Sequence, residues 1–420
     1  MRKRIILSWA LIVICGGAST YAQTTDLFDL VKTGTPQNIQ AAIDHGSDVN
    51  ARDNEALTPL MLAAGNPDPR VTSTLLKAGA DLKARDWLGR TPLMRAAEFN
   101  LNPEVVSALL KAGADTRDQD NDGLTALMLA AENQSVGIIS VLLKAGADTK
   151  ARDGLGATPL MLAGLFNSNP EVIPALLKAG ADVQTRDGLG RTPLMLAAEF
   201  NPNAEVVSAF LKAGANTKAR DKEAFTPLMF AAKNPKPAVI SALLKAGADT
   251  KDRDLLDMTP LMLAAEFNPN AEVVSALLKA GADTKARDKL GKTALLWAIE
   301  QNPNPEAISA LLTAGANANA RDKDGASALM LAARGTNVEM ITILLKAGAD
   351  IKARDGFGMT ALMYAAEFNA NPDVLSALLK GGADLQARDG LGETAPILAY
   401  EFNSNPEVAS LLPVPPSGGF

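Results

Sequence analysis

The chain has 420 residues, of which 47% are hydrophobic and 21% charged, a composition that excludes a disordered or low-complexity protein. Aromatic residues make up only 4%, which suits many small helices better than one large aromatic core. With 41 basic against 47 acidic residues the formal charge is −6, which argues against binding to a nucleic-acid phosphate backbone.

Residues 1–22 are typical of a secretory signal peptide. A basic start at residues 2–4 precedes an apolar run at residues 5–14, and Ala22 stands before a cleavage position at Gln23. The run is too short to span a bilayer. Two alternatives are an uncleaved anchor and a lipoprotein attached through Cys15. The sequence therefore predicts export across the inner membrane, into the periplasm of a Gram-negative host or otherwise to the extracellular space.

Removal of this segment would take away three basic residues and the single cysteine. The balance would then be 38 basic against 47 acidic residues, a formal charge of −9. A mature chain without cysteine has no disulfide and no thiol chemistry, so an oxidising compartment would leave it unchanged in this respect.

The rest of the chain repeats itself every 33 or 34 residues. The recurring stretch "TPLMLAAEF" begins with a Thr or Ser that aligns in eleven units, and no linker separates them. The aligned residues are Thr58, Thr91, Thr125, Thr158, Thr192, Thr226, Thr259, Thr293, Ser327, Thr360 and Thr394.

Each unit predicts two short helices and a turn-rich finger. The aligned Thr is a helix N-cap, and the Pro that usually follows suits the first helical position. In the second helix Asn102 is the predicted cap, Pro103 starts the first turn, and Gly113 suits a left-handed helix end. Neither helix can bury its apolar face alone, so the units must stack on their neighbours.

This pattern resembles the ankyrin repeat family, whose motif runs Asp-x-x-Gly-x-Thr-Pro-Leu-His-x-Ala-Ala and later Gly-Ala-Asp. The resemblance implies an all-α ankyrin-repeat solenoid of helix-turn-helix units joined by β-hairpin-like fingers. We expect a signal peptide at 1–22, an N-terminal capping unit with the first finger at 23–57, and ten ankyrin repeats at 58–393. A C-terminal capping unit at 394–412 and a flexible tail at 413–420 complete the chain.

One departure from the family is systematic, because methionine replaces the motif histidine in nine units. We expect an apolar ladder of core side chains there in place of a polar one, with an oxidant-sensitive ladder as the alternative. The residues are Met61, Met94, Met128, Met161, Met195, Met229, Met262, Met330 and Met363, with Leu296 and Ile397 completing the series.

The sequence offers no constellation for catalysis. His45, the single histidine, has no accompanying nucleophile, and neither phosphate-binding loops nor metal-ligand spacings occur. We therefore predict no enzyme activity, no cofactor and no metal. An Arg-Asp dipeptide recurs in ten of the eleven fingers, and the expected role is mutual pairing between solvated charges of adjacent fingers.

The finger tips are the predicted partner-binding residues. Seven tips are apolar, and Trp87 beside Leu88 is the best single anchor. An exposed apolar row usually marks an interaction site, although the leucines could instead pack between neighbouring fingers. The apolar tips are Leu88, Leu155, Leu189, Leu256, Leu290, Phe357 and Leu391, and the others are Glu55, Asp122, Glu223 and Asp324.

The seven units with apolar tips also carry one extra residue between their helices, usually the Phe of "EFN". The units follow one another as short-long and then three times as short-long-long. This order gives a larger repeat of 101 residues, as from Thr125 to Thr226 to Ser327. Block duplication explains this correlation without contact between a tip and its Phe. We expect these phenylalanines to fill the longer loops.

These observations predict a non-catalytic protein–protein interaction scaffold that acts outside the cytoplasm through its finger tips and concave face. Its partner is expected to be another protein, with no nucleic acid and no membrane span, and the chain is expected to be a monomer. The alternative is an inhibitor or immunity-type protein that blocks a single secreted enzyme or toxin.

Overall fold

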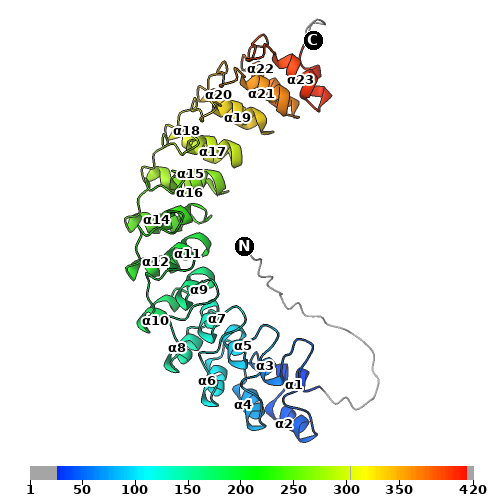
Figure 1. Ribbon diagram of the computed structural model, residues 1–420, viewed down its shortest axis with the longest axis vertical. Coiled ribbons are helices and arrows are strands. Elements are labelled where there is room, and N and C mark those ends of the chain that lie inside the picture. Colours follow the sequence, from blue (N-terminus) through cyan, green and yellow to red (C-terminus); the bar gives the residue numbers. More distant parts are fainter. Residues whose placement is uncertain (1–25, 303, 414–420) are drawn as a thin grey trace.

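The computed structural model describes residues 26–302 and 304–413; the predicted signal peptide and residues 414–420 of the predicted tail lie outside this range. Within the described residues the chain forms 24 helices, and the only bridge between extended segments joins Arg321 and Ser327. The helices follow one another along a curved solenoid (Figure 1). The prediction of an all-α repeat solenoid is confirmed.

The helices form two rows, with the first helix of each unit on the inner side of the arc and the second on its outer side (Figure 1). Two helices precede the first repeat, α1 (Leu27–Thr33) and α2 (Pro36–Asp44). The first helices of the repeats are α3 (Pro59–Ala63), α5 (Pro92–Phe99), α7 (Ala126–Glu132), α9 (Pro159–Phe166), α11 (Pro193–Phe200), α13 (Pro227–Ala232), α15 (Pro260–Phe267), α17 (Ala294–Gln301), α19 (Ala328–Arg334), α21 (Ala361–Phe368) and α23 (Ala395–Phe402). The second helices are α4 (Pro69–Lys77), α6 (Pro103–Lys111), α8 (Val136–Lys144), α10 (Val172–Lys178), α12 (Ala204–Lys212), α14 (Pro237–Lys245), α16 (Ala271–Lys279), α18 (Pro305–Thr313), α20 (Val338–Lys346), α22 (Pro372–Lys380) and α24 (Pro406–Ser410).

The methionines at the motif position are buried, as expected of core residues, but their sulfur atoms also take part in helix capping. In α11 the Thr192 Oγ1 accepts the Met195 backbone N–H at 3.4 Å, and the Met195 Sδ accepts the Thr192 N–H at 3.3 Å. The same backbone-to-sulfur contact occurs in six further first helices. The expectation that these methionines are core side chains is confirmed, and their sulfur atoms add a weak acceptor at this position.

One substitution between near-identical units is matched by its neighbour. Phe210 of α12 stands where most units have Leu, and its side chain is fully buried. Gly164 of α9 stands where most units have Ala, and a Cβ there would lie 3.0 Å from Phe210 Cε2. The smaller residue makes room for the larger ring, since cores pack too densely to absorb three extra carbon atoms otherwise.

Buried asparagines connect the loops between the helices of successive units. Asn201 is fully buried, and its Nδ2 donates to the Asn167 carbonyl at 2.9 Å and to the Gly164 carbonyl at 2.8 Å. Its Oδ1 accepts the backbone N–H of Asn203 at 2.9 Å. Each amide thus satisfies carbonyls that the preceding first helix leaves without a partner at its C-terminal end. The members of this asparagine ladder are Asn66, Asn100, Asn133, Asn167, Asn201, Asn234, Asn268, Asn302, Asn369 and Asn403.

The finger arginines form a second ladder. Arg152 Nη1 donates to the Gly156 carbonyl in its own finger at 2.6 Å and to the Arg186 carbonyl of the next finger at 2.7 Å. Gln119, which replaces arginine in one finger, makes the equivalent two contacts through Nε2, to Gly123 at 3.1 Å and to Arg152 at 3.3 Å. The side chain at this position therefore joins two fingers through their backbones.

The aspartate of each Arg-Asp dipeptide stabilises its own finger. Asp153 Oδ1 accepts the backbone N–H groups of Leu155 at 2.9 Å and Ala157 at 2.8 Å. The left-handed residue that closes this turn is Gly156, with φ +78°. Arg85 pairs with Asp118 and Arg220 with Asp252 of the next finger, each at 2.7 Å, so the predicted pairing between adjacent fingers does occur, but with aspartates outside the aligned dipeptides. The dipeptide itself supplies a carbonyl-binding donor and a turn-closing acceptor.

The asparagine ladder is interrupted at Gly335, which offers a test of its contribution to stability. Gly335 has φ −86°, and a Cβ there would meet no atom closer than the Ala332 carbonyl oxygen at 3.5 Å. We expect Gly335→Asn to raise the free energy of unfolding by about 0.5–1.5 kcal/mol through the restored hydrogen bonds, beyond the gain from lower chain entropy. Gly335→Ala is the control for entropy, and the midpoints of urea denaturation compare the two variants. Equal midpoints would show that the amide contributes nothing.

Candidate protein-binding surface

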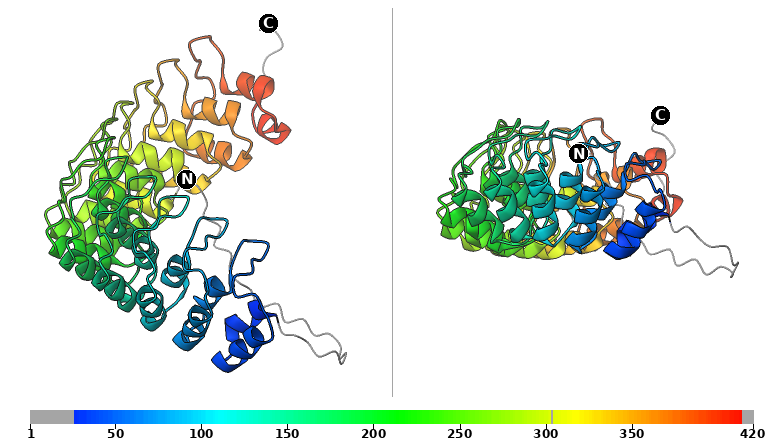
Figure 2. Two further views of the ribbon diagram at one scale, coloured as in Figure 1. Left: turned by 60° about the horizontal axis from the view of Figure 1, so that its bottom comes forward. Right: turned by 90° about the horizontal axis from the view of Figure 1, so that it is seen from below.

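The finger tips lie along one edge of the solenoid, beside the first helices that line its inner side (Figure 2). Trp87 is 63% exposed and Leu88 is half-buried, while the other six predicted tip residues are 53–87% exposed. Apart from Leu88, the tip side chains therefore do not pack between neighbouring fingers. The structure brings all eight predicted residues, Trp87, Leu88, Leu155, Leu189, Leu256, Leu290, Phe357 and Leu391, onto the ends of the finger loops.

A second apolar row lies at the C-terminal ends of the first helices. Its six phenylalanines are 41–58% exposed, so the expectation that they fill the longer loops was wrong. The row consists of Phe99, Phe166, Phe200, Phe267, Phe368 and Phe402. We call the surface between the tips and this row the inner strip. The signal for this row in the sequence is the recurring "EFN".

Finger aspartates also bind donors from the first helices across the inner strip. Asp288 Oδ2 accepts the Trp297 Nε1–H at 2.8 Å, and Asp355 Oδ2 accepts the Tyr364 hydroxyl at 2.7 Å. Asp86 Oδ2 accepts from Arg95 Nε at 2.7 Å. Because one oxygen of each carboxylate closes the finger turn and the other holds the helix, these fingers are fixed relative to the helices.

Cationic side chains lie over several rings of the inner strip. The Lys233 ammonium is 4.8 Å from the centre of the Phe225 ring and 5.4 Å from that of Phe267. The Arg334 guanidinium lies 5.5 Å from the Phe368 ring. Such contacts contribute roughly 0.5–2 kcal/mol, depending on how far the cation is removed from water.

Acidic residues recur one position before these rings. Five glutamates directly precede a phenylalanine of the row, and Glu132 and Glu300 occupy the same position in helices without that Phe; the five are Glu98, Glu199, Glu266, Glu367 and Glu401. Burial raises the pKa of Glu266 to about 7, since the nearby charges of Lys233 and Lys292 compensate only part of the desolvation. Burial also raises the pKa of Glu199 and of Glu367. The inner strip thus holds carboxylates that lack full compensation.

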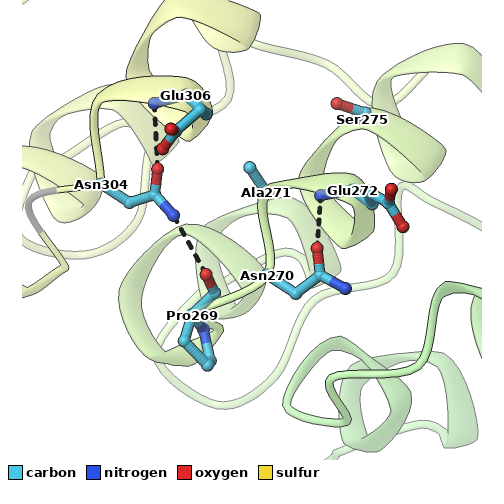
Figure 3. A pocket seen from close by; sticks show the side chains of 7 residues that line it. All are labelled: Pro269, Asn270, Ala271, Glu272, Ser275, Asn304 and Glu306. Carbon is cyan, nitrogen blue, oxygen red and sulfur yellow. Dashed lines mark hydrogen bonds between the residues drawn. The ribbon is translucent and has the colours of Figure 1, made fainter.

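Away from the inner strip, a shallow hollow of about 450 Å³ lies between the N-terminal ends of α16 and α18 (Figure 3). Its polar groups are engaged in capping. Asn304 donates to the Pro269 carbonyl at 3.0 Å and accepts the Glu306 N–H at 2.9 Å, and Asn270 accepts the Glu272 N–H at 3.0 Å. We therefore assign this hollow a structural role at the helix ends.

His45 lies at the C-terminal end of α2, with its Nδ1 2.6 Å from the Ala41 carbonyl oxygen. No group of three or more His, Cys, Asp or Glu side chains within residues 26–302 and 304–413 is arranged to hold a metal ion. In the same part of the chain, every helix is too short or too polar to cross a membrane.

Comparison with known families agrees with this architecture. A sequence model described as ankyrin repeats (3 copies) matches residues 27–120, 95–187, 160–254, 261–355, 295–389 and 329–413. Because these matches cover well over half of the chain, the protein belongs to the ankyrin repeat family. Ankyrin repeats are generally protein–protein interaction modules, and proteins built from them are typically non-catalytic binding scaffolds. A comparison with curated proteins finds no match.

The raised pKa of Glu266 predicts a pH-dependent stability. Between the ordinary carboxyl pKa of 4.5 and about 7, the folded chain retains this proton and the unfolded chain releases it, so stability falls as pH rises through this window. We expect Glu266→Gln to stabilise the chain at about pH 8, by on the order of 1 kcal/mol because solvent screens a half-buried group. The difference should vanish near pH 4.5, where the wild-type carboxyl is protonated.

Thermal midpoints of both proteins at the two pH values measure this effect, and Glu223→Gln at an exposed finger tip is the control for net charge. A Glu266→Gln variant that behaves like the control at both pH values would contradict the assignment.

Proposed function

We propose that this chain is a non-catalytic scaffold that binds another protein outside the cytoplasm through its finger tips and inner strip. The observation that carries the proposal is the row of exposed apolar tips on fingers that are tied together through their backbones. A large apolar side chain on a fixed loop can be buried by a partner with little loss of conformational freedom, which is the condition for a binding hot spot. Trp87 is the tip residue with the largest ring.

We also propose that the chain acts as a monomer and without chemistry of its own. Recurring polar residues serve turns, helix caps and connections between units, so repetition explains them without a reaction. Export is inferred from residues 1–22, and a chain that keeps no cysteine after their removal is compatible with an oxidising compartment.

An inhibitor or immunity-type protein is the second candidate. The observation that favours it is the row of glutamates on the inner strip, together with the acidic balance of the chain. A concave acidic surface would attract a basic enzyme or toxin and speed their association. Capture of a single enzyme whose activity falls on binding would favour this candidate over a general scaffold.

Substitution of the tips tests the proposed binding surface. A tagged mature chain would capture its partner from the envelope or secreted fraction, and mass spectrometry would identify it. We expect Leu155→Ser with Leu189→Ser to weaken binding of the purified partner by about 1 kcal/mol or more, while thermal stability stays nearly unaltered because these tips are exposed. Leu194→Ala is the control: a buried cavity should lower stability by roughly 2–5 kcal/mol and affect binding only indirectly. Unchanged binding by the tip variants would contradict this surface.

Export has its own test. We expect the mature protein to begin at Gln23 and to be recovered outside the cytoplasm, because the cleavage position follows Ala22. N-terminal sequencing of protein from separated cell fractions measures both properties. A chain that retains Met1 and stays in the cytosolic fraction would refute the proposed location and leave the binding surface unaffected.

A further inference from the structure

The 101-residue repeat creates four equivalent places on the inner strip, and comparison of them shows which are occupied by the chain itself. Each place has a Glu followed by Phe or Gln at the end of a first helix. The four pairs are Glu98–Phe99, Glu199–Phe200, Glu300–Gln301 and Glu401–Phe402.

At the first place, cations from the same unit satisfy both members of the pair. Arg90 forms an ion pair with Glu98, and the Arg95 guanidinium lies 5.6 Å from the centre of the Phe99 ring. Arg90 is also held by Asp120, with Nε and Oδ2 3.2 Å apart. The Glu–aromatic combination at this position therefore accepts positively charged groups.

The third place is filled by a single lysine. Lys292 forms an ion pair with Glu300, and its ammonium lies 4.3 Å from the centre of the Trp297 ring. Trp297 takes the place that Arg95 has in the first block, so the aromatic surface has moved by one helical turn. Here one cation serves both the carboxylate and a ring, whereas the first place uses two cations, Arg90 for Glu98 and Arg95 for Phe99.

The second place lacks these cations. Arg191 binds Asp187 at 2.8 Å instead of Glu199, and Leu196 stands where the first block has Arg95. Within the described residues no ion pair reaches Glu199 and no cation lies over Phe200. Burial raises the pKa of Glu199, with the charges of Lys233 and Arg191 opposing this shift. Its carboxylate thus lacks the partner that Glu98 and Glu300 have.

The surroundings of the second place leave it accessible. Helices α9 and α11 are neighbours along the arc (Figure 1). Phe166 ends α9 and Phe200 ends α11, and both rings are partly exposed. The Lys233 ammonium of the following unit lies over the rings of Phe225 and Phe267, and among the described residues it forms no ion pair with Glu199. The fourth place also lacks a basic residue, because Glu393 replaces the arginine. Of these two places without a cation, only the second has a repeat on each side.

We propose that Glu199 and Phe200 bind a basic side chain, an arginine, of the protein partner. This inference rests on the proposed function and adds the chemistry of the group that is recognised. A guanidinium can stack on a phenyl ring and donate two hydrogen bonds to a carboxylate at once, so one side chain satisfies both members of the pair. The internal cations at the first and third places provide the precedent within this chain.

The test uses fluorescein-labelled nona-arginine as the probe, with nona-citrulline as its neutral control, and measures binding to the mature chain by fluorescence anisotropy. We expect Glu199→Gln and Phe200→Ala each to weaken binding of nona-arginine by about fivefold or more. Glu98→Gln removes the same charge at a place that is already filled, so it should change binding less than about twofold. Leu196→Arg introduces the arginine that the first block has at position 95. This side chain should occupy the second place and thereby weaken binding of nona-arginine. Nona-citrulline should not bind.

Equal weakening by Glu98→Gln and Glu199→Gln would overturn the inference, because it would reflect net charge alone. Failure of the wild-type chain to bind nona-arginine would overturn it as well. Circular dichroism of each variant verifies the fold. Binding of the captured partner to the tip variants tests the scaffold function separately. If the tip variants bind the partner more weakly while Glu199→Gln binds both nona-arginine and the partner as the wild type does, only the assignment of Glu199 and Phe200 fails.

Discussion

The structure depends on hydrogen bonds that cross from one unit to the next. Helices of five to nine residues leave most of their terminal backbone groups without partners inside the helix. Asn201 and its equivalents supply donors to the carbonyls of the preceding unit, and Arg152 and its equivalents do the same between fingers. A unit is therefore complete only beside its neighbours, and this is the physical reason why the sequence repeats.

This arrangement separates the residues that build the solenoid from those that are free to vary. Positions that close turns or cross between units recur with few exceptions, such as Gly335 and Gln119, because each has the same carbonyl or N–H to satisfy. Positions on the inner strip have no such obligation. Arg95, Leu196 and Trp297 occupy one place in three successive blocks, and the differences among them decide whether the neighbouring carboxylate and ring are filled from within.

Rigidity of the fingers links the scaffold to binding. The tips carry apolar side chains on loops that hydrogen bonds hold in place. In such a loop an aspartate accepts backbone N–H groups of the turn, and an arginine donates to a carbonyl of the next finger. In some units the aspartate also reaches the first helix, as Asp288 reaches Trp297. Because the finger positions are set by these bonds, the spacing of tips along the solenoid follows from the stacking of the helices.

The sequence by itself determined the repeat, its helices and their caps, because these features follow from local chemistry within about 30 residues. Thr192 followed by Pro193, and Gly113 at a helix end, predict their structure without knowledge of distant parts. Only the tertiary structure decided what each polar side chain binds. The Arg-Asp dipeptide suggested mutual pairing, but the donors of Arg152 reach a carbonyl 34 residues away, and the Met195 sulfur caps a backbone N–H. Likewise, the Glu-Phe dipeptide is the same at residues 98–99 and 199–200. Only the tertiary structure shows that Arg90 and Arg95 contact the first pair and that Arg191 turns to Asp187 and leaves the second pair without a cation.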